Sequence, residues 1–146
     1  MVNYRRYRVH NGTYAFAITL RDRRSALLVE RIDALFSAWH NARRRVPHRI
    51  IAFVVMPDHI HTVVSMRDGG DDYSRLIQDF KKGFTRRVCA VGSPWQSRFW
   101  EHTVRGERDL ANHIAYIHHN PVKHGWCQAP TDWRYSSVHR SHRLWG

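Results

Sequence analysis

The stretch that decides the fold is IIAFVVMPDHIHTVVSM, residues 50–66. Its first part, Ile50 to Met56, is a continuous apolar run, which predicts a central strand. Met56-Pro57-Asp58-His59 then predicts a tight turn, because proline at the second turn position presets φ. From His59 to Met66 the side chains return to an alternating pattern, which indicates a second strand. The stretch therefore predicts a β-hairpin.

Patterns on either side of this hairpin predict the remaining elements. Tyr14 to Leu20 alternates large and small residues and predicts a strand whose large side chains share one face. The other predicted elements are a helix from Ser25 to about Arg45, a helix from about Asp72 to Ala90, a strand from Arg98 to Arg105 and a helix from about Glu107 towards Asn120. Pro121 is expected to end the last helix. The segment from Gly125 onward is aromatic and irregular.

The predicted order, β-α-β-β-α-β-α, defines the fold class. It is the α+β, ferredoxin-like split βαβ pattern with an additional C-terminal helix. An antiparallel sheet with helices on one face is the expected architecture. The 146 residues are expected to form one domain, residues 1–146, with residues 139–146 as a flexible tail.

Composition narrows the class of protein. No apolar run approaches the roughly 20 residues that span a bilayer. Met1 to Arg6 lacks the apolar stretch of a signal peptide. The cysteines, Cys89 and Cys127, are too few for a disulfide framework and suit a reducing compartment. We therefore expect a compact domain in the cytoplasm.

The charge balance points to a polyanionic partner. Lys+Arg is 24 and Asp+Glu is 12, a net charge of +12, and nucleic acid is the commonest cytoplasmic polyanion. On the predicted helix 72–90, Arg75, Lys82 and Arg86 fall on the face opposite an apolar stripe. Such a row could follow a phosphate backbone or could be an ordinary solvated face. These three residues are our candidate DNA-binding surface.

His59-Ile60-His61 is a candidate metal site at the start of the second hairpin strand. Residues i and i+2 of a strand share a face, so both imidazoles can reach one divalent ion. An isolated His-x-His pair also arises by chance in a chain with 12 histidines. The pair becomes informative only together with other residues.

The predicted helix 107–120 carries a second candidate group. Tyr116 and Asn120 are four residues apart and are neighbours on the helix surface, with His113 beside them. A tyrosine at a helix edge is ordinarily a half-buried packing residue. Periodicity alone does not single out any of the six tyrosines.

Four blocks of this sequence resemble a known family. Met56 to His61 resembles the HUH motif (His, hydrophobic, His) of the single-tyrosine HUH transposases, and Tyr116 to Gly125 is similar to their nucleophile helix. Trp95 to His102 and Trp133 to Ser137 resemble the branch called REP-associated tyrosine transposases. The resemblance extends over the chain from about Tyr14 to Val138.

The resemblance implies an activity and a set of site residues. Members of this family cut and rejoin single-stranded DNA, and the branch recognises hairpins of repeated extragenic palindromes (REP). By position, Tyr116 would be the nucleophile that forms a 5′-phosphotyrosine, with His59, His61 and Asn120 as metal ligands. Mixed N/O ligation suits Mg²⁺ or Mn²⁺, and zinc fits on ligand type alone. The resemblance also implies a bacterial protein, nucleoid-associated when DNA-bound, that works as a monomer or a homodimer.

Other hypotheses stay open at this point. One is a non-catalytic, domesticated nucleic-acid-binding domain, and another is a metal-dependent hydrolase that uses water. A zinc site of Cys127 with histidine is remote, because no second cysteine has ligand spacing to it. The group that activates Tyr116 is also open among His113, His118 and His119. Tryptophans such as Trp100 either stack on bases or pack in the core.

Overall fold

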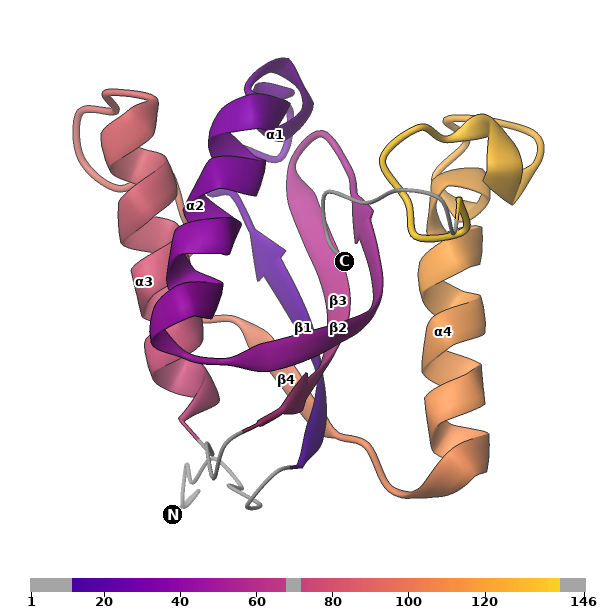
Figure 1. Ribbon diagram of the computed structural model, residues 1–146. Coiled ribbons are helices and arrows are strands. Elements are labelled where there is room, and N and C mark those ends of the chain that lie inside the picture. Colours follow the sequence, from indigo (N-terminus) through magenta and orange to yellow (C-terminus); the bar gives the residue numbers. More distant parts are fainter. Residues whose placement is uncertain (1–11, 68–71, 140–146) are drawn as a thin grey trace, which may run out of the picture.

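The computed structural model describes residues 12–67 and 72–139 (Figure 1). Met1 to Arg6 and all of the expected tail except His139 lie outside these residues, as does Trp145. The elements are β1 (Thr13–Thr19), α1 (Leu27–Glu30), α2 (Ile32–Arg45), β2 (His48–Val55), β3 (His59–Met66), α3 (Tyr73–Arg87), β4 (Trp100–Thr103), α4 (Gly106–Lys123) and a short 3-10 helix (Pro130–Asp132). The predicted element order is confirmed. None of the helices in the described ranges is long and apolar enough to cross a membrane.

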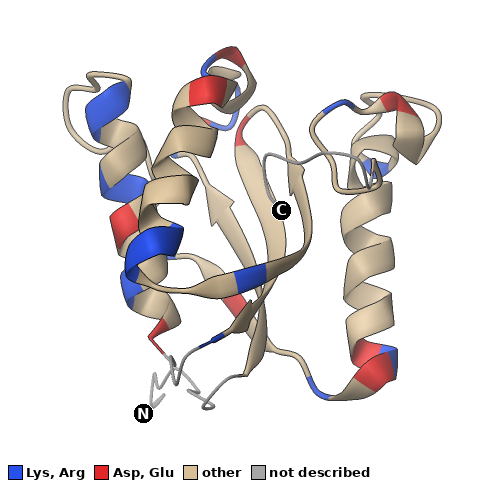
Figure 2. Cartoon of the chain, in the orientation of Figure 1, with Lys and Arg blue, Asp and Glu red and all other residues tan. Residues whose placement is uncertain are grey.

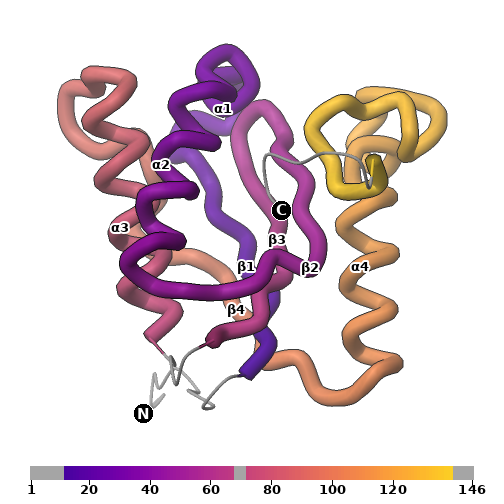
Figure 3. Tube along the Cα trace, in the orientation of Figure 1, coloured from indigo at the N-terminus to yellow at the C-terminus, as the bar shows by residue number. Residues whose placement is uncertain are grey.

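The four strands form one antiparallel sheet in the order β2-β3-β1-β4. This order is the ferredoxin-like arrangement, so the predicted α+β fold class is confirmed. Helices α2 and α3 cover one face and α4 lies on the opposite side (Figures 1 and 3). Helices thus cover both faces of the sheet, whereas the element order predicted a one-sided arrangement.

The strand sequences explain why both faces are covered. The large side chains of β1 and of Leu20 beyond it, Tyr14, Phe16, Ile18 and Leu20, are all buried in the main core with α2 and α3. Smaller apolar residues on the other face of the strands, Ala15, Val54 and Val63, form a second core with Ile117 of α4. Burying apolar area on both faces favours a helix on each.

The hairpin turn is tied to the end of β1. The Met56 N–H donates to the His59 carbonyl at 2.8 Å and closes the predicted turn. The Leu20 N–H donates to the Asp58 carbonyl at 2.8 Å. β3 lies between β1 and β2, with His59 opposite Thr19 and His61 opposite Ala17. The His-x-His pair therefore sits on a central strand next to an anchored turn.

The predicted helix from Ser25 to Arg45 is broken at Arg31, where φ is −117° and ψ is 43°. The preceding short helix α1 is held by the hairpin turn, because the Leu28 N–H donates to the Pro57 carbonyl at 3.2 Å. This tertiary contact is absent from any local pattern. Two other elements are shorter than predicted: α3 ends at Arg87, shortly before Cys89 with φ of 55°, and β4 spans only Trp100–Thr103.

Helix α4 does not end before Pro121, and this prediction was wrong. The helix continues to Lys123, and the N–H groups of His124 and Trp126 donate to the carbonyls of Asn120 and Pro121 at 3.1 and 3.0 Å. Proline removes only one N–H donor from the helix, and these two hydrogen bonds complete the turn around it. Asn120 therefore keeps its helical position relative to Tyr116.

The segment after α4 covers the outer edge of the sheet. Ser136 forms a bridge with Val54 of β2, and the Tyr135 carbonyl accepts from the Val55 N–H at 2.8 Å. The Trp133 indole donates to the Val55 carbonyl at 2.9 Å. The irregular aromatic segment predicted here thus satisfies the free backbone groups of an edge strand.

Candidate active site

His59 and His61 project from β3 towards α4, and their ring centroids are 5.0 Å apart. Helix α4 brings Asn120 to them: His59 Nε2 lies 3.3 Å from Asn120 Oδ1. Asn120 is 1% exposed and His59 is 5% exposed, so the pair is buried. Three residues from two parts of the sequence are therefore brought together as the resemblance implied.

Tyr116 lies at the open side of this group. Its ring is 44% exposed, and its centroid is 5.5 Å from that of His61 at an interplanar angle of 89°. The Lys123 ammonium donates to the Tyr116 hydroxyl at 3.4 Å and sits 5.0 Å from the ring centroid. A cation at this place stabilises negative charge on the phenol oxygen. Lys123 lies seven residues further along the same helix and was not among the predicted site residues.

A cavity of about 500 Å³ opens beside Tyr116, between α4 and the sheet. His61 and Tyr116 line one part of it, and Trp100 and His113 line another. Its wall is mainly apolar, with Ala15, Phe16 and Ile117 among the lining residues. The cavity provides space for a substrate group directly next to the tyrosine.

Asp58 is a site residue that the sequence analysis treated only as part of the turn. The ring of His59 donates through Nδ1 to Asp58 Oδ1 at 2.8 Å, and the Arg23 guanidinium donates to Asp58 Oδ2. Burial alone would raise the pKa of Asp58, but the hydrogen bonds from Arg23 and His59 outweigh it and lower that pKa. The carboxylate thus stays ionised and fixes the His59 tautomer with Nε2 free to accept. Its position next to His59 in the sequence was the available signal.

The electrostatics of the site keep His61 neutral. Burial, together with the electrostatic influence of His59, His124 and Lys123, lowers the pKa of His61 to about 3. A neutral imidazole is the form that binds a metal. His124, whose ring centroid is 5.2 Å from that of His59, was in the quoted motif but had no predicted role.

The donor atoms present are compatible with a divalent ion. With its proton on Nδ1, His59 presents a lone pair at Nε2 towards the Asn120 amide oxygen, 3.3 Å away. Ligand atoms on one ion at about 2.1 Å are roughly 3.0–3.4 Å apart. An ion between two such acceptors would satisfy both. The Asn120 amide nitrogen is buried and has no hydrogen-bond partner in the described structure.

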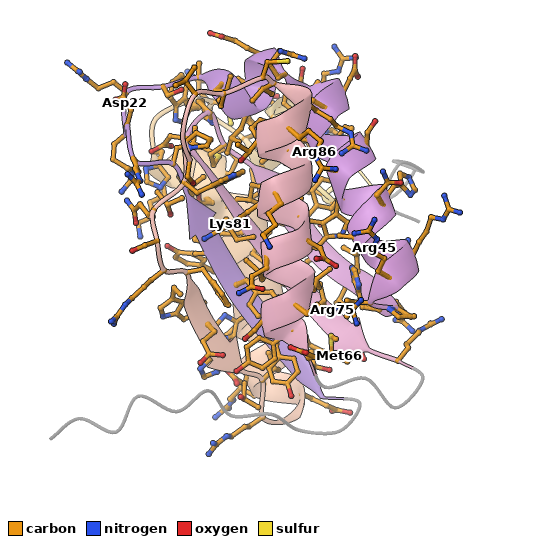
Figure 4. The ribbon with its side chains drawn as sticks, turned by 90° about the vertical axis from the view of Figure 1, so that its left-hand side faces the viewer. Asp22, Arg45, Met66, Arg75, Lys81 and Arg86 are labelled. Atoms are coloured by element: carbon orange, nitrogen blue, oxygen red, sulfur yellow. The ribbon has the colours of Figure 1, made fainter. Side chains whose placement is uncertain are left out.

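Several other predicted residues lie outside this group. Arg75, Lys82 and Arg86 are exposed on α3, which lies on the far side of the sheet from α4 (Figure 1). Figure 4 shows Arg75 and Arg86 along this helix. Among the histidines considered as activators, His118 bonds Ser137 Oγ at 2.8 Å and His113 faces Asp109 at 3.3 Å. Trp95 is buried in the core, whereas Trp100 is 51% exposed. Both cysteines are free thiols.

A ferredoxin-like sheet whose His-x-His strand faces a tyrosine-bearing helix places this chain in the class of HUH single-tyrosine proteins. Comparison with known proteins supports the class directly. The family model described as "Transposase IS200 like" matches residues 8–120, and the chain belongs to this transposase family. It is therefore a single-tyrosine transposase.

Individual relatives indicate which branch of the family this chain resembles. The chain is 42% identical over 140 residues to the REP-associated tyrosine transposase of Escherichia coli K12. That alignment covers 96% of this chain and 84% of the relative. A Haemophilus influenzae Rd relative assigned to the same branch is 39% identical, with 96% and 87% covered. The solved structure of a REP-associated tyrosine transposase bound to a REP hairpin matches with a TM-score of 0.91 and 41% identity, over 100% of this chain and 88% of that one.

Proposed function

We propose that this transposase cleaves and rejoins single-stranded DNA at REP-type hairpins, with Tyr116 as the nucleophile and His59, His61 and Asn120 as ligands of a divalent ion. The observation that carries the proposal is the convergence of a half-exposed tyrosine with the His59–Asn120 pair, 3.3 Å apart, on one face of the sheet. Tyr116 contacts this group through the ring of His61.

The chemistry follows from the placement of Tyr116. Its hydroxyl oxygen attacks the phosphorus, the P–O bond to the 3′ oxygen breaks, and a 5′-phosphotyrosine forms. The phenol proton leaves to solvent, to which Tyr116 is 44% exposed, and the leaving 3′ oxygen takes up a proton from solvent to give a free 3′-hydroxyl. Lys123 stabilises the phenol oxygen as it loses the proton. Attack by a 3′-hydroxyl on the phosphotyrosine reverses the step and rejoins a strand.

A bound divalent ion, Mg²⁺ or Mn²⁺, would polarise the scissile phosphate and offset charge on the leaving 3′ oxygen. The chain supplies two imidazoles and one amide oxygen, which leaves coordination positions for phosphate and water. Asp58 orients His59 for this purpose. Mn²⁺ matches imidazole better than Mg²⁺ does.

The choice of hairpin DNA rests on the relatives and on the charge. The REP-associated relative was solved with a REP hairpin bound, and it covers the whole of this chain. The net charge of +12 suits a nucleic-acid partner. Trp100 and Trp126, which are 51% and 56% exposed, are available to stack on unpaired bases. The protein would act at the nucleoid in the cytoplasm, as a monomer or a homodimer.

A covalent-adduct assay tests the proposal. The full chain and Mn²⁺ are incubated with hairpin-bearing single strands that carry a label on the 3′ side of the cut, and the products are run on a denaturing gel. A tyrosine transesterase leaves the label on the protein band. Tyr116→Phe removes only the attacking oxygen, so we expect the adduct to disappear while hairpin affinity stays unchanged.

The outcomes separate the alternatives. Shortened DNA without a shifted protein band indicates a hydrolase that uses water, and binding without cleavage indicates a domesticated binding domain. Tyr135→Phe is the matched control, because Tyr135 packs against the main core and should leave the adduct intact. An adduct that persists in Tyr116→Phe would overturn the site assignment.

A further inference from the structure

A second group of metal-ligating side chains lies at the other end of α4. We infer that His102, Asp109 and His113 bind a divalent transition-metal ion, with zinc as the best match, at the junction of β4 and α4. This site shares no residue with the predicted catalytic ligands. In the described parts of the chain, it is the one group of three or more His, Cys, Asp or Glu residues placed closely enough to hold an ion.

The distances between the donor atoms carry the inference. His102 Nε2 lies 2.8 Å from Asp109 Oδ2, and His113 Nε2 lies 3.3 Å from Asp109 Oδ1. One ligand atom from each residue lies within 4.8 Å of the other two. Ligands on a single ion at about 2.1 Å are separated by roughly 3.0–3.4 Å, so binding requires only small side-chain movements.

The three side chains are also held in place by their neighbours. The Arg105 N–H donates to Asp109 Oδ2 at 2.9 Å and fixes the carboxylate at the start of α4. The His102 ring stacks on Trp100 at an interplanar angle of 7°, with the centroids 6.0 Å apart. The ring centroids of His102 and His113 are 4.6 Å apart. Such outer contacts orient ligands before an ion arrives.

The donor set selects the class of ion. Two imidazoles and one carboxylate match zinc and other first-row divalent ions, whereas Mg²⁺ and Ca²⁺ prefer oxygen donors. All three residues are half-buried, which leaves room for water at the remaining position. The same contacts also form a hydrogen-bonded trio without an ion if each ring carries its proton on Nε2. A binding experiment separates these two states.

The position of the site indicates what an ion would do. Asp109 and His113 are one turn apart on α4, and His102 is on β4, so the ion would join the first turns of the helix to the sheet edge. Between these turns and Tyr116 lies the cavity of about 500 Å³ that Trp100, His113 and Tyr116 line. The metal would supply a rigid contact between β4 and the first turns of α4, beside this cavity. The ion would thus position the helix that carries the nucleophile.

Metal titration of the full chain tests the site. The double variant His59→Ala/His61→Ala removes the predicted catalytic ligands, so any remaining tight site is a different one. We expect this variant to bind one Zn²⁺ per chain, with visible absorption when Co²⁺ replaces Zn²⁺. Adding His102→Gln or Asp109→Asn should weaken Zn²⁺ binding by about 100-fold or more, since even outer-shell losses cost roughly 10- to 100-fold.

The control is His40→Ala in the same background. It removes an exposed histidine of α2 and should leave the Zn²⁺ stoichiometry unchanged. A double variant that binds no Zn²⁺ overturns the inference, and so does unchanged affinity after His102→Gln. Circular dichroism checks that each variant is folded. Because the readout is binding, the result is independent of whether the protein cleaves DNA.

Hydrogen exchange tests the positioning role. Zn²⁺ should slow amide exchange in residues 106–113 of the double variant and should have no such effect after His102→Gln. Equal protection in both variants would mean that the ion does not hold α4.

Discussion

At the residue scale, the environment of His59 supports the proposal that the His-x-His pair is a metal site rather than a chance pair. One ring nitrogen donates to the Asp58 carboxylate, and the other faces the Asn120 amide oxygen. Asp58 is itself held by Arg23, so the loop between β1 and α1 and the turn between β2 and β3 together set the ring orientation. His61 is kept neutral beside it by burial, which lowers its pKa to about 3.

This arrangement predicts unequal effects of three substitutions. His59→Ala or His61→Ala should abolish strand cleavage and leave hairpin binding largely intact, because phosphate contacts are spread over many basic residues. Asn120→Ala should impair cleavage less, since water can replace a neutral amide ligand. Cleavage gels with Mn²⁺ and binding measured without Mn²⁺ report the two effects. Full-rate cleavage by chelator-treated wild-type protein would contradict the metal role.

At the scale of elements, the connection from α2 to β2 depends on a buried neutral histidine. His48 is 2% exposed, accepts from the Trp39 indole at 3.0 Å and bonds the Val46 carbonyl at 2.8 Å. Burial lowers its pKa to about 4, although the bond to Val46 acts in the opposite direction and Arg43 adds to the lowering. Protonation would remove the acceptor for the Trp39 indole.

The folding stability should therefore depend on pH in a defined window. The folded pKa of His48 is below its unfolded value of 6.5, so the unfolded state takes up the proton first as pH falls. Stability should decline from pH 6.5 to about 4, by at most about 3 kcal/mol from this group. Urea unfolding across this range measures the decline, and His48→Gln should make it shallower. An identical pH dependence in His48→Gln would show that other groups cause it.

At the scale of the whole molecule, the sheet separates two surfaces with different properties. The proposed catalytic residues, which include His59, Asn120 and Tyr116, lie between the sheet and α4. Basic residues gather on α3 and the C-terminal end of α2 (Figure 2). A groove between these helices is lined by Arg45, Lys82, Arg86 and Arg87. If a DNA hairpin bound on that side, its single-stranded part would have to pass around the edge of the sheet to reach Tyr116.

The salt dependence of binding tests whether that basic surface contacts DNA. Charge reversal of Arg75, Lys82 and Arg86 to glutamate should flatten the log–log slope of affinity against salt by about 2, since each contact contributes roughly 0.7–0.9. Lys82→Glu alone should flatten the slope by about 0.7–0.9, and Arg24→Glu, the same kind of reversal at an exposed side chain before α1, is its control. An unchanged slope would place the DNA on another surface, such as the α4 side.

Local patterns in the chain were enough to predict the β-hairpin, the order of elements and the buried face of β1. These features depend on local periodicity and on turn residues such as Pro57, which act over a few positions and are visible in the chain. The proposed metal ligands and nucleophile were identified only through a family resemblance, because spacing alone left His59, His61 and Tyr116 among many histidines and tyrosines.

The burial and the contact partners of these side chains depend on the tertiary structure. Tyr116 and Asn120 are four residues apart on one helix, yet packing of α4 against β2 and β3 leaves the first 44% exposed and the second 1% exposed. Asp58 gained its role through contact with Arg23, 35 residues away. His102 joined Asp109 and His113 only because β4 and α4 meet there. Periodicity describes one element at a time, whereas burial and partners depend on which faces two elements bring together.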